Sequence, residues 1–218
     1  MPVNNIEIVR NLIHFELEGD VYFAEVIARG KDFGKSGETL IRDFRIHNFE
    51  HFDEVMPTII ELCDHYHARC YFRLNQRNTD ELNSHLKIAM EEQELCRKQA
   101  IRKFIKNGCD RNRVDKLPRV TSGAKLYASV MGKFSSETRE TRKWIIDVDA
   151  EENRTLDEVE KMYTDAVLAC GGKILARIPS RTGMHLVINT INKSDFAKII
   201  GSAKAINEDG NTNLYIGD

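Results

Sequence analysis

The sequence lacks the features of membrane, secreted and disulfide-rich proteins. No apolar segment approaches the length that crosses a bilayer, and the N-terminus has no basic segment followed by an apolar one, as a signal peptide has. The five cysteines are odd in number, scattered, and form no C-x₂-C pair, so we expect reduced thiols. These absences predict a cytoplasmic protein that does not bind a membrane.

The chain also has no large excess of charge of either sign. Its 32 Lys and Arg residues and 34 Asp and Glu residues give a formal net charge of −2. This balance excludes a protein that coats nucleic acid with its whole surface, but it allows a local basic groove. With 218 residues, 41% of them hydrophobic and 30% charged, the chain has the composition of a soluble globular protein with a proper core.

A glycine-rich stretch at residues 30–37 resembles a phosphate-binding G-x₄-G-K-S/T loop, but it is one residue short. Residues 38–41 then have the pattern of a strand, whereas a phosphate-binding loop continues into a helix whose N-terminus holds the phosphate. We therefore predict a glycine-rich β-hairpin that joins strands at residues 21–28 and 39–46.

The other N-terminal elements follow from apolar periodicity. Helical spacing occurs at residues 5–14, 49–67 and 80–106, and a further strand pattern occurs at residues 68–75. A polar linker with a short helix is expected after the long helix. The predicted organisation is an N-terminal α/β unit with a long helix (1–110), a linker and short helix (111–142) and a second unit (143–218).

The second unit has the predicted order β-α-β-β-α-β. Its elements are a strand at 143–149, a helix at 156–170, strands at 173–178 and 185–189, a helix ending near residue 206 and a strand at 213–216. This order is the split βαβ pattern of ferredoxin-like and RNA-recognition-motif (RRM) domains. The predicted fold class is α+β, with an RRM-like unit packed on the N-terminal α/β unit.

Two carboxylates one residue apart end the first of these strands. Alternate side chains of a strand share a face, so Asp147 and Asp149 point one way while Ile146 and Val148 point the other. Like charges so close repel unless one is protonated or a cation lies between them, and paired carboxylates suit Mg²⁺ or Mn²⁺. The alternative is a strand that ends at the surface with both acids solvated.

The third strand of the second unit opens with His185, after a turn at residues 179–184. In a split βαβ fold the first and third strands are central neighbours, so the topology can bring this imidazole close to Asp147 and Asp149. The alternative is a histidine whose hydrogen bonds are satisfied within the sheet.

These motifs resemble those of the archaeo-eukaryotic primase superfamily, whose catalytic unit is RRM-like. Its first motif, an apolar run ending in Asp-x-Asp, is matched by residues 144–149, and its second, a small residue two positions before a histidine, by Gly183 and His185. Its third motif, an apolar strand followed by aspartate, is matched best by Asp218, although Gly217 is inserted between the strand and this acid.

The resemblance implies a metal-dependent nucleotidyltransferase of the primase or primase-polymerase type, which makes short nucleic-acid chains on a template in DNA replication. It implies that Asp147, Asp149 and His185 are catalytic. It also implies that Mg²⁺ or Mn²⁺ is bound by Asp147, Asp149 and a third acid, which is Asp218 or the competing Asp209.

The resemblance further implies that Ser180, Arg181, Gly183 and His185 bind the phosphates of the incoming nucleotide. The partners it implies are nucleoside triphosphates, a DNA or RNA template, and a helicase or other replication partner. The absence of appended modules suits a mobile element.

Two other functions fit the same sequence. In a non-catalytic RRM-like nucleic-acid-binding module, the acids and the histidine would have no catalytic role. A Rep-like HUH endonuclease would use His65 and His67 with a tyrosine nucleophile. That enzyme needs both histidines on a central strand, whereas the apolar pattern places them at a helix end.

Overall fold

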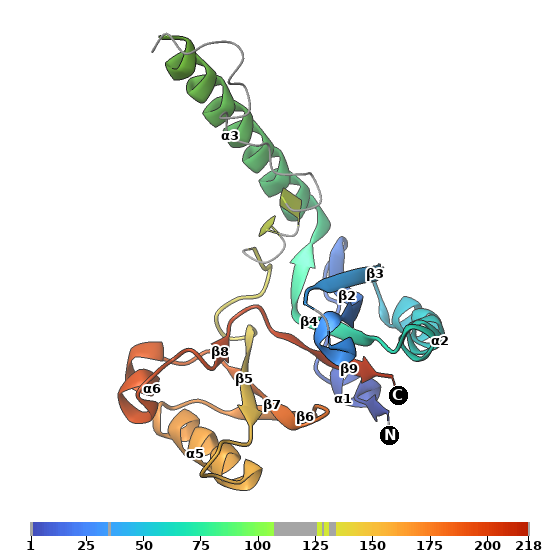
Figure 1. The fold of residues 1–218 in the computed structure, drawn as a ribbon, viewed down its shortest axis with the longest axis vertical. Helices are drawn as coiled ribbons and strands as arrows, with labels where there is room; N and C mark the ends of the chain where they lie inside the picture. Colours follow the sequence, from blue (N-terminus) through green and yellow to red (C-terminus); the bar gives the residue numbers. More distant parts are fainter. Residues whose placement is uncertain (1, 35, 107–125, 128, 131–133, 218) are drawn as a thin grey trace. The chain divides into compact units, whose positions relative to one another are not determined.

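The computed structural model describes residues 2–34, 36–106, 126–127, 129–130 and 134–217 (Figure 1). Most of the linker predicted at 111–142 lies outside these residues. The chain forms two compact units, one from Met1–Gln76 with Ser136–Asp218 and one from Arg77–Ser135. The first unit is mixed α+β and contains two antiparallel sheets, which agrees with the predicted fold class at this level.

The first sheet has five strands in the order β1-β9-β4-β2-β3. Their bounds are Val3–Asn4 for β1, Asn211–Ile216 for β9, Arg69–Asn78 for β4, Asp20–Arg29 for β2 and Glu38–Ile46 for β3. Strands β2 and β3 pair as a hairpin around the 3-10 helix η1 (Gly30–Phe33). This arrangement confirms the predicted glycine-rich hairpin.

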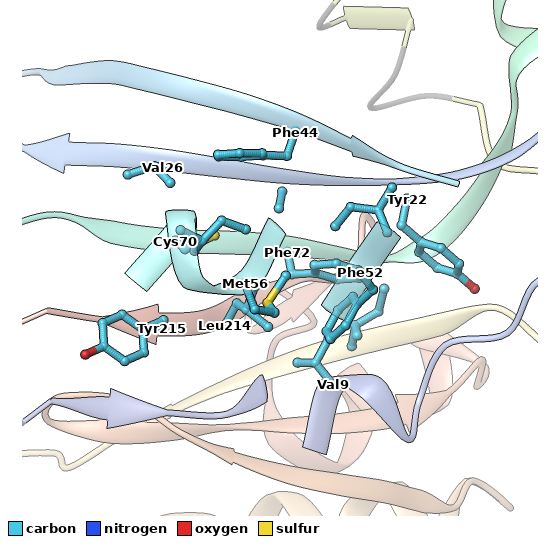
Figure 2. Close-up of a cluster of buried hydrophobic side chains, with 14 of the residues drawn as sticks. Val9, Tyr22, Val26, Phe44, Phe52, Met56, Cys70, Phe72, Leu214 and Tyr215 are labelled. Carbon is cyan, nitrogen blue, oxygen red and sulfur yellow. The ribbon is translucent and has the colours of Figure 1, made fainter. Parts of the chain in front are cut away.

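Helix α2 (Phe49–Tyr66) packs on the first sheet, and the short helix α1 (Ile6–Arg10) joins the same core. Asn48 caps α2 by accepting a hydrogen bond from the backbone of His51 at 2.7 Å, which stabilises the first turn. The buried face of α2 is apolar and meets aromatic and sulfur-containing side chains of the strands. Figure 2 shows this cluster, with Val9, Tyr22, Val26, Phe44, Phe52, Met56, Cys70, Phe72, Leu214 and Tyr215 labelled.

The second sheet has four strands in the order β6-β7-β5-β8. Along the chain the elements are β5 (Lys143–Asp149), α5 (Leu156–Ala169), β6 (Ile174–Pro179), β7 (Gly183–Asn189), α6 (Lys193–Ile200) and β8 (Ile206–Asn207). Thr155 and Glu158 form a capping box that starts α5. Both helices cover one face of the sheet, where Trp144, Ile146 and Val148 are buried (Figure 1).

The opposite face of the second sheet contributes to the core of the first. Ile145, Ile178 and Val187 belong to the same apolar cluster as the side chains of α2. The residues of β5 thus alternate between two cores, as a strand covered on both faces requires. Asp147 and Asp149 follow Ile145 on the face that is turned away from α5 and α6, as predicted.

The prediction that residues 213–216 form the fourth strand of the second sheet is wrong. Residues 213–216 belong to β9, which lies in the first sheet between β1 and β4. Every residue of β9 from Thr212 onward is buried, as expected of a strand with a neighbour on each side. The two-residue β8 takes the edge beside β5 instead, because α6 ends early, at Gly201 in the left-handed region (φ +87°).

Two buried asparagines join the sheets. Asn75 on β4 donates to the carbonyl of Lys143 at 2.8 Å and accepts from its N–H at 2.7 Å, which fixes the start of β5. Asn5 donates to the carbonyls of Pro179 and Asn213, at 2.9 Å and 3.0 Å. Because polar groups buried at such a junction must be paired, these bonds specify how the sheets meet.

The second unit contains the long helix α3 (Thr79–Lys106), which confirms the helix predicted at 80–106. Near its start Leu82 is buried, and the ring of His85 stacks on Phe134 with centroids 3.7 Å apart. Within the described residues, no helix is both long and apolar enough to cross a membrane.

We expect Phe72→Ala to destabilise the first unit by about 3–5 kcal/mol, because it leaves a cavity in a well-packed core. Phe72 is fully buried, stacked on Tyr22 at 5.7 Å and edge-on to Phe52 at 6.0 Å. Urea unfolding measures the change. The control Leu175→Ala, at a strand residue with 43% exposure, should cost far less. Equal losses for the two variants would contradict this packing.

Candidate functional site

The pairing of β5 with β7 brings the predicted catalytic residues together. In this antiparallel register Asp147 lies opposite His185, and Asp149 lies opposite Gly183. The His185 Nε2 atom is 3.5 Å from an Asp147 carboxylate oxygen. The structure therefore places two carboxylates and one imidazole on one sheet face, as the sequence predicted.

Gly183 is required by the close approach of its strand to the acids. A Cβ atom built on it would lie 2.1 Å from the carbonyl oxygen of Val148 and 2.7 Å from a carboxylate oxygen of Asp149. The preceding turn is closed by two bonds between Ser180 and Gly183: a backbone bond of 2.9 Å and a bond of 3.0 Å to the serine hydroxyl. Any side chain at 183 would push β7 away from Asp149.

A residue that sequence reasoning missed, Thr212 on β9, anchors the imidazole. Its hydroxyl lies 2.8 Å from Nδ1 of His185, and its side chain is fully buried. One ring nitrogen is thus held by the first sheet while the other faces Asp147. A β-branched residue suits this role because its χ1 rotation is restricted in a strand.

Burial and neighbouring charges shift the pKa values of Asp147 and His185. Partial burial raises the pKa of Asp147, as does the charge of Asp149, whereas His185 and Arg29 act in the opposite direction. Burial lowers the pKa of His185, although the two carboxylates oppose this effect. The ring is therefore neutral near pH 7, and the carboxylates have no full positive charge from it.

The acids and the imidazole line a cleft of about 560 Å³ between the two sheets, which we call the intersheet cleft. Its lining is mostly polar and comes from strands of both sheets, from η1 and from the turn between β6 and β7. The lining residues are Arg29, Lys31, Asp32, Arg69, Tyr71, Asp147, Asp149, Ser180, Thr182, His185, Asn207, Asn211 and Asn213.

The carboxylate pair fits a hard divalent cation. Asp147 and Asp149 share one face and line a polar cleft, where burial first and the charge of Asp149 second raise the pKa of Asp147. Among the described residues, no three His, Cys, Asp or Glu side chains gather as a complete metal site. Mg²⁺ is commonly held by one or two carboxylates, with water and substrate phosphates as the other ligands, so two acids suffice.

The third metal ligand is not identified by the structure. Asp218 lies outside the described residues. Asp209 lies between β8 and β9, 4.0 Å from the guanidinium of Arg73, and is not among the residues that line the cleft.

Of the two turn residues predicted to bind phosphate, only one lines the cleft. Ser180 lines the intersheet cleft, but Arg181 donates a hydrogen bond of 3.0 Å to the carbonyl of Gly217 and is not among the lining residues.

The two histidines predicted for a Rep-like endonuclease lie at the end of a helix. His65 lies in the last turn of α2, and His67 caps this helix with φ at 48°. Neither histidine is on a central strand, so the arrangement that a Rep-like endonuclease requires is not formed.

We expect Asp147→Asn to raise the melting temperature at pH 7 in EDTA. Folding raises the pKa of Asp147, so ionised Asp147 lowers the free energy of unfolding. This loss of stability is fully present above the folded pKa. It is absent below the ordinary pKa of 3.8, where the carboxyl group is protonated in both states. The gain should therefore disappear below pH 3.8, as thermal unfolding at both pH values would show. A gain of the same size at both pH values would exclude relief of an ionised carboxylate as its cause.

Gly183→Ala should weaken the carboxylate site without unfolding the protein. In wild type, adding Mg²⁺ or Mn²⁺ should raise the melting temperature by mass action. This gain should fall in Gly183→Ala because the added methyl displaces β7 from Asp149. Gly171→Ala, where the added Cβ meets nothing within 4 Å but the backbone is left-handed (φ +72°), is the control for a destabilising glycine substitution away from the acids. The same metal-dependent gain in Gly183→Ala and wild type would contradict the close approach.

Comparison of the chain with protein-family models, with curated proteins and with solved structures found no match. We therefore infer its function from the intersheet cleft and from the residues that line it.

Proposed function

We propose that this protein is a metal-dependent nucleotidyltransferase of the primase or primase-polymerase type, which joins nucleotides on a nucleic-acid template. The observation that carries the proposal is the placement of Asp147, Asp149 and His185 on paired strands at one wall of a polar cleft. The opposite wall contains Arg29 and Lys31, so the cleft offers both carboxylates for a cation and cations for phosphate groups.

The strand order of the second sheet supports an RRM-like catalytic unit. Numbered from β5, the order across the sheet is second, third, first, fourth, and all neighbours are antiparallel. Both helices lie on one face, and the site lies on the other. This arrangement is the one expected of a split βαβ domain, in which the first and third strands are central.

The proposed reaction is attack by a 3′-hydroxyl oxygen on the α-phosphorus of a nucleoside triphosphate. A new P–O bond forms, the bond to the β-phosphate oxygen breaks, pyrophosphate leaves, and the hydroxyl proton passes to solvent. Asp147 and Asp149 would hold Mg²⁺ or Mn²⁺, which when bound favours ionisation of the hydroxyl and neutralises charge on the pyrophosphate. Within the described residues, Asp147 forms an ion pair only with His185, and Asp149 forms none.

The imidazole would act as a hydrogen-bond donor to the triphosphate. With Nδ1 held by the Thr212 hydroxyl, the Nε2 edge of His185 faces the cleft and Asp147. A neutral ring with hydrogen on Nε2 is favoured there, because a lone pair would be repelled by the carboxylate. Ser180 lies in the same wall and would contact the same phosphates.

Incorporation of labelled NTPs or dNTPs on primed and unprimed templates, with Mg²⁺ or Mn²⁺, tests the proposal. We expect Asp147→Asn and Asp149→Asn to abolish incorporation, and His185→Ala to lower it about 100-fold through loss of a preorganised donor. Asp43→Asn on β3, an exposed acid outside the cleft, controls for the loss of one carboxylate charge.

The non-catalytic module makes the opposite prediction. It expects the wild-type protein to bind single strands but to incorporate no nucleotide with either metal. It also expects Asp147→Asn and His185→Ala to bind strands as wild type does. Those two results together would contradict the proposed enzyme and support the non-catalytic binding module.

A further inference from the structure

The first sheet supplies the cationic wall of the intersheet cleft. Arg29 ends β2, Lys31 lies in η1, and Arg69 and Tyr71 come from β4. Arg69 is already committed, because it makes two bonds, of 2.6 Å and 2.9 Å, to the carboxylate of Asp32. This bidentate pair fixes η1 on the sheet and leaves the other two cations facing the cleft.

Arg29 is oriented but not fully neutralised. It donates to the hydroxyl oxygen of Tyr71 at 3.3 Å, and its Nε lies 3.5 Å from a carboxylate oxygen of Glu38 without a hydrogen bond. The Glu38 side chain is 59% exposed, and ion pairs to such solvated groups are weak. The Tyr71 hydroxyl accepts from Arg29 and so retains its own hydrogen for a ligand.

Lys31 is exposed at the same wall. No carboxylate in the part of the chain that the structure describes forms an ion pair with it. Its ammonium group can therefore reach a ligand without breaking a pair. A fixed guanidinium beside a mobile ammonium group suits phosphate oxygens, which accept several hydrogen bonds at once.

We propose that Arg29 and Lys31, assisted by the Tyr71 hydroxyl, form a phosphate-binding wall for an oligophosphate chain whose other side faces Asp147 and Asp149. This inference rests on the proposed function, in which that chain is the triphosphate of a nucleotide. It adds cationic phosphate contacts from the first sheet to the contacts of His185 and Ser180, since Arg181, in the turn between β6 and β7, bonds to Gly217 instead. The charge of Arg29 already acts on Asp147, because it lowers the pKa of this acid.

The carboxylates of the cleft offset the positive charge of the phosphate-binding wall until a bound cation neutralises them. The cleft lining contains three cationic side chains, Arg29, Lys31 and Arg69, and three carboxylates, Asp32, Asp147 and Asp149. An oligophosphate entering this neutral cleft is repelled by the acid pair. Removing the charge of that pair should therefore strengthen phosphate binding. A cation bound to the pair should do the same, and phosphate binding should then strengthen cation binding by the same factor.

Calorimetric titration with sodium tripolyphosphate in EDTA tests the wall without any nucleotide transfer. We expect Arg29→Gln to weaken binding about tenfold and Lys31→Gln to weaken it less, since each removes hydrogen bonds to a charged group. Asp149→Asn should instead strengthen binding. The control is Arg10→Gln, which removes the same charge from an arginine paired with Asp53 at 3.0 Å outside the cleft and should leave binding unchanged.

Several results would overturn the phosphate-binding wall. These are unchanged binding in both Arg29→Gln and Lys31→Gln, an equal loss in Arg10→Gln, and no binding of millimolar tripolyphosphate by either wild type or Asp149→Asn. A single-stranded oligonucleotide without terminal phosphate tests the other source of phosphate. If Arg29→Gln weakens only the oligonucleotide, the wall binds a strand backbone and the proposal fails.

These outcomes are independent of the enzymatic proposal. If the protein incorporates no nucleotide but tripolyphosphate binding depends on Arg29, the phosphate-binding wall is confirmed and the transferase proposal is wrong. If incorporation is observed but Arg29→Gln binds tripolyphosphate as wild type does, the transferase proposal is supported and the phosphate-binding wall is wrong.

Discussion

The register between β5 and β7 is the constraint on which the site depends. Side chains alternate along a strand, so a slip of one residue would turn Asp147 and Asp149 toward α5 and α6 and Val148 into the cleft. Burial prevents such a slip, since Trp144, Ile146 and Val148 fill one core and Ile145 fills the other. The same hydrophobic pattern that folds β5 therefore aims the two acids.

The two sheets depend on each other through β9. This strand follows the second sheet in the chain but pairs within the first, and it brings the Thr212 hydroxyl to His185. The buried bonds of Asn5 and Asn75 hold the sheets at the same junction. A cleft formed in this way needs both sheets, so neither the acid pair nor the cationic wall would form a site alone.

Local patterns predicted most of the elements and the acid-imidazole cluster. The alternation of side chains in residues 143–149 predicted that Asp147 and Asp149 share one face. The β-α-β-β order correctly predicted that β5 and β7 are neighbours. The hairpin at residues 30–37 was also recognisable, because its glycines lacked a following helix. Each of these features is encoded within a few residues or one supersecondary unit.

Long-range pairing could not be predicted in the same way. Nothing in the local sequence of β9 distinguishes an edge of the second sheet from the centre of the first. Because α6 ends early, at Gly201, the residues after it form β8 at that edge, and β9 pairs within the first sheet. Arg29, Lys31 and Thr212 were missed because their importance arises only when the two sheets meet. Arg181 is close to His185 in sequence, which predicts a contact with the same phosphates, but its side chain bonds to the carbonyl of Gly217.

Paramagnetic broadening of backbone NMR signals by Mn²⁺ tests most directly whether the carboxylate pair holds a cation in a cleft shared by both sheets. The account predicts that substoichiometric Mn²⁺ broadens the amides of Asp147, Asp149 and His185 from the second sheet, together with Arg29 and Thr212 from the first, and that Asp149→Asn removes this pattern. Broadening at other acids of the surface, or no difference between wild type and Asp149→Asn, would contradict it.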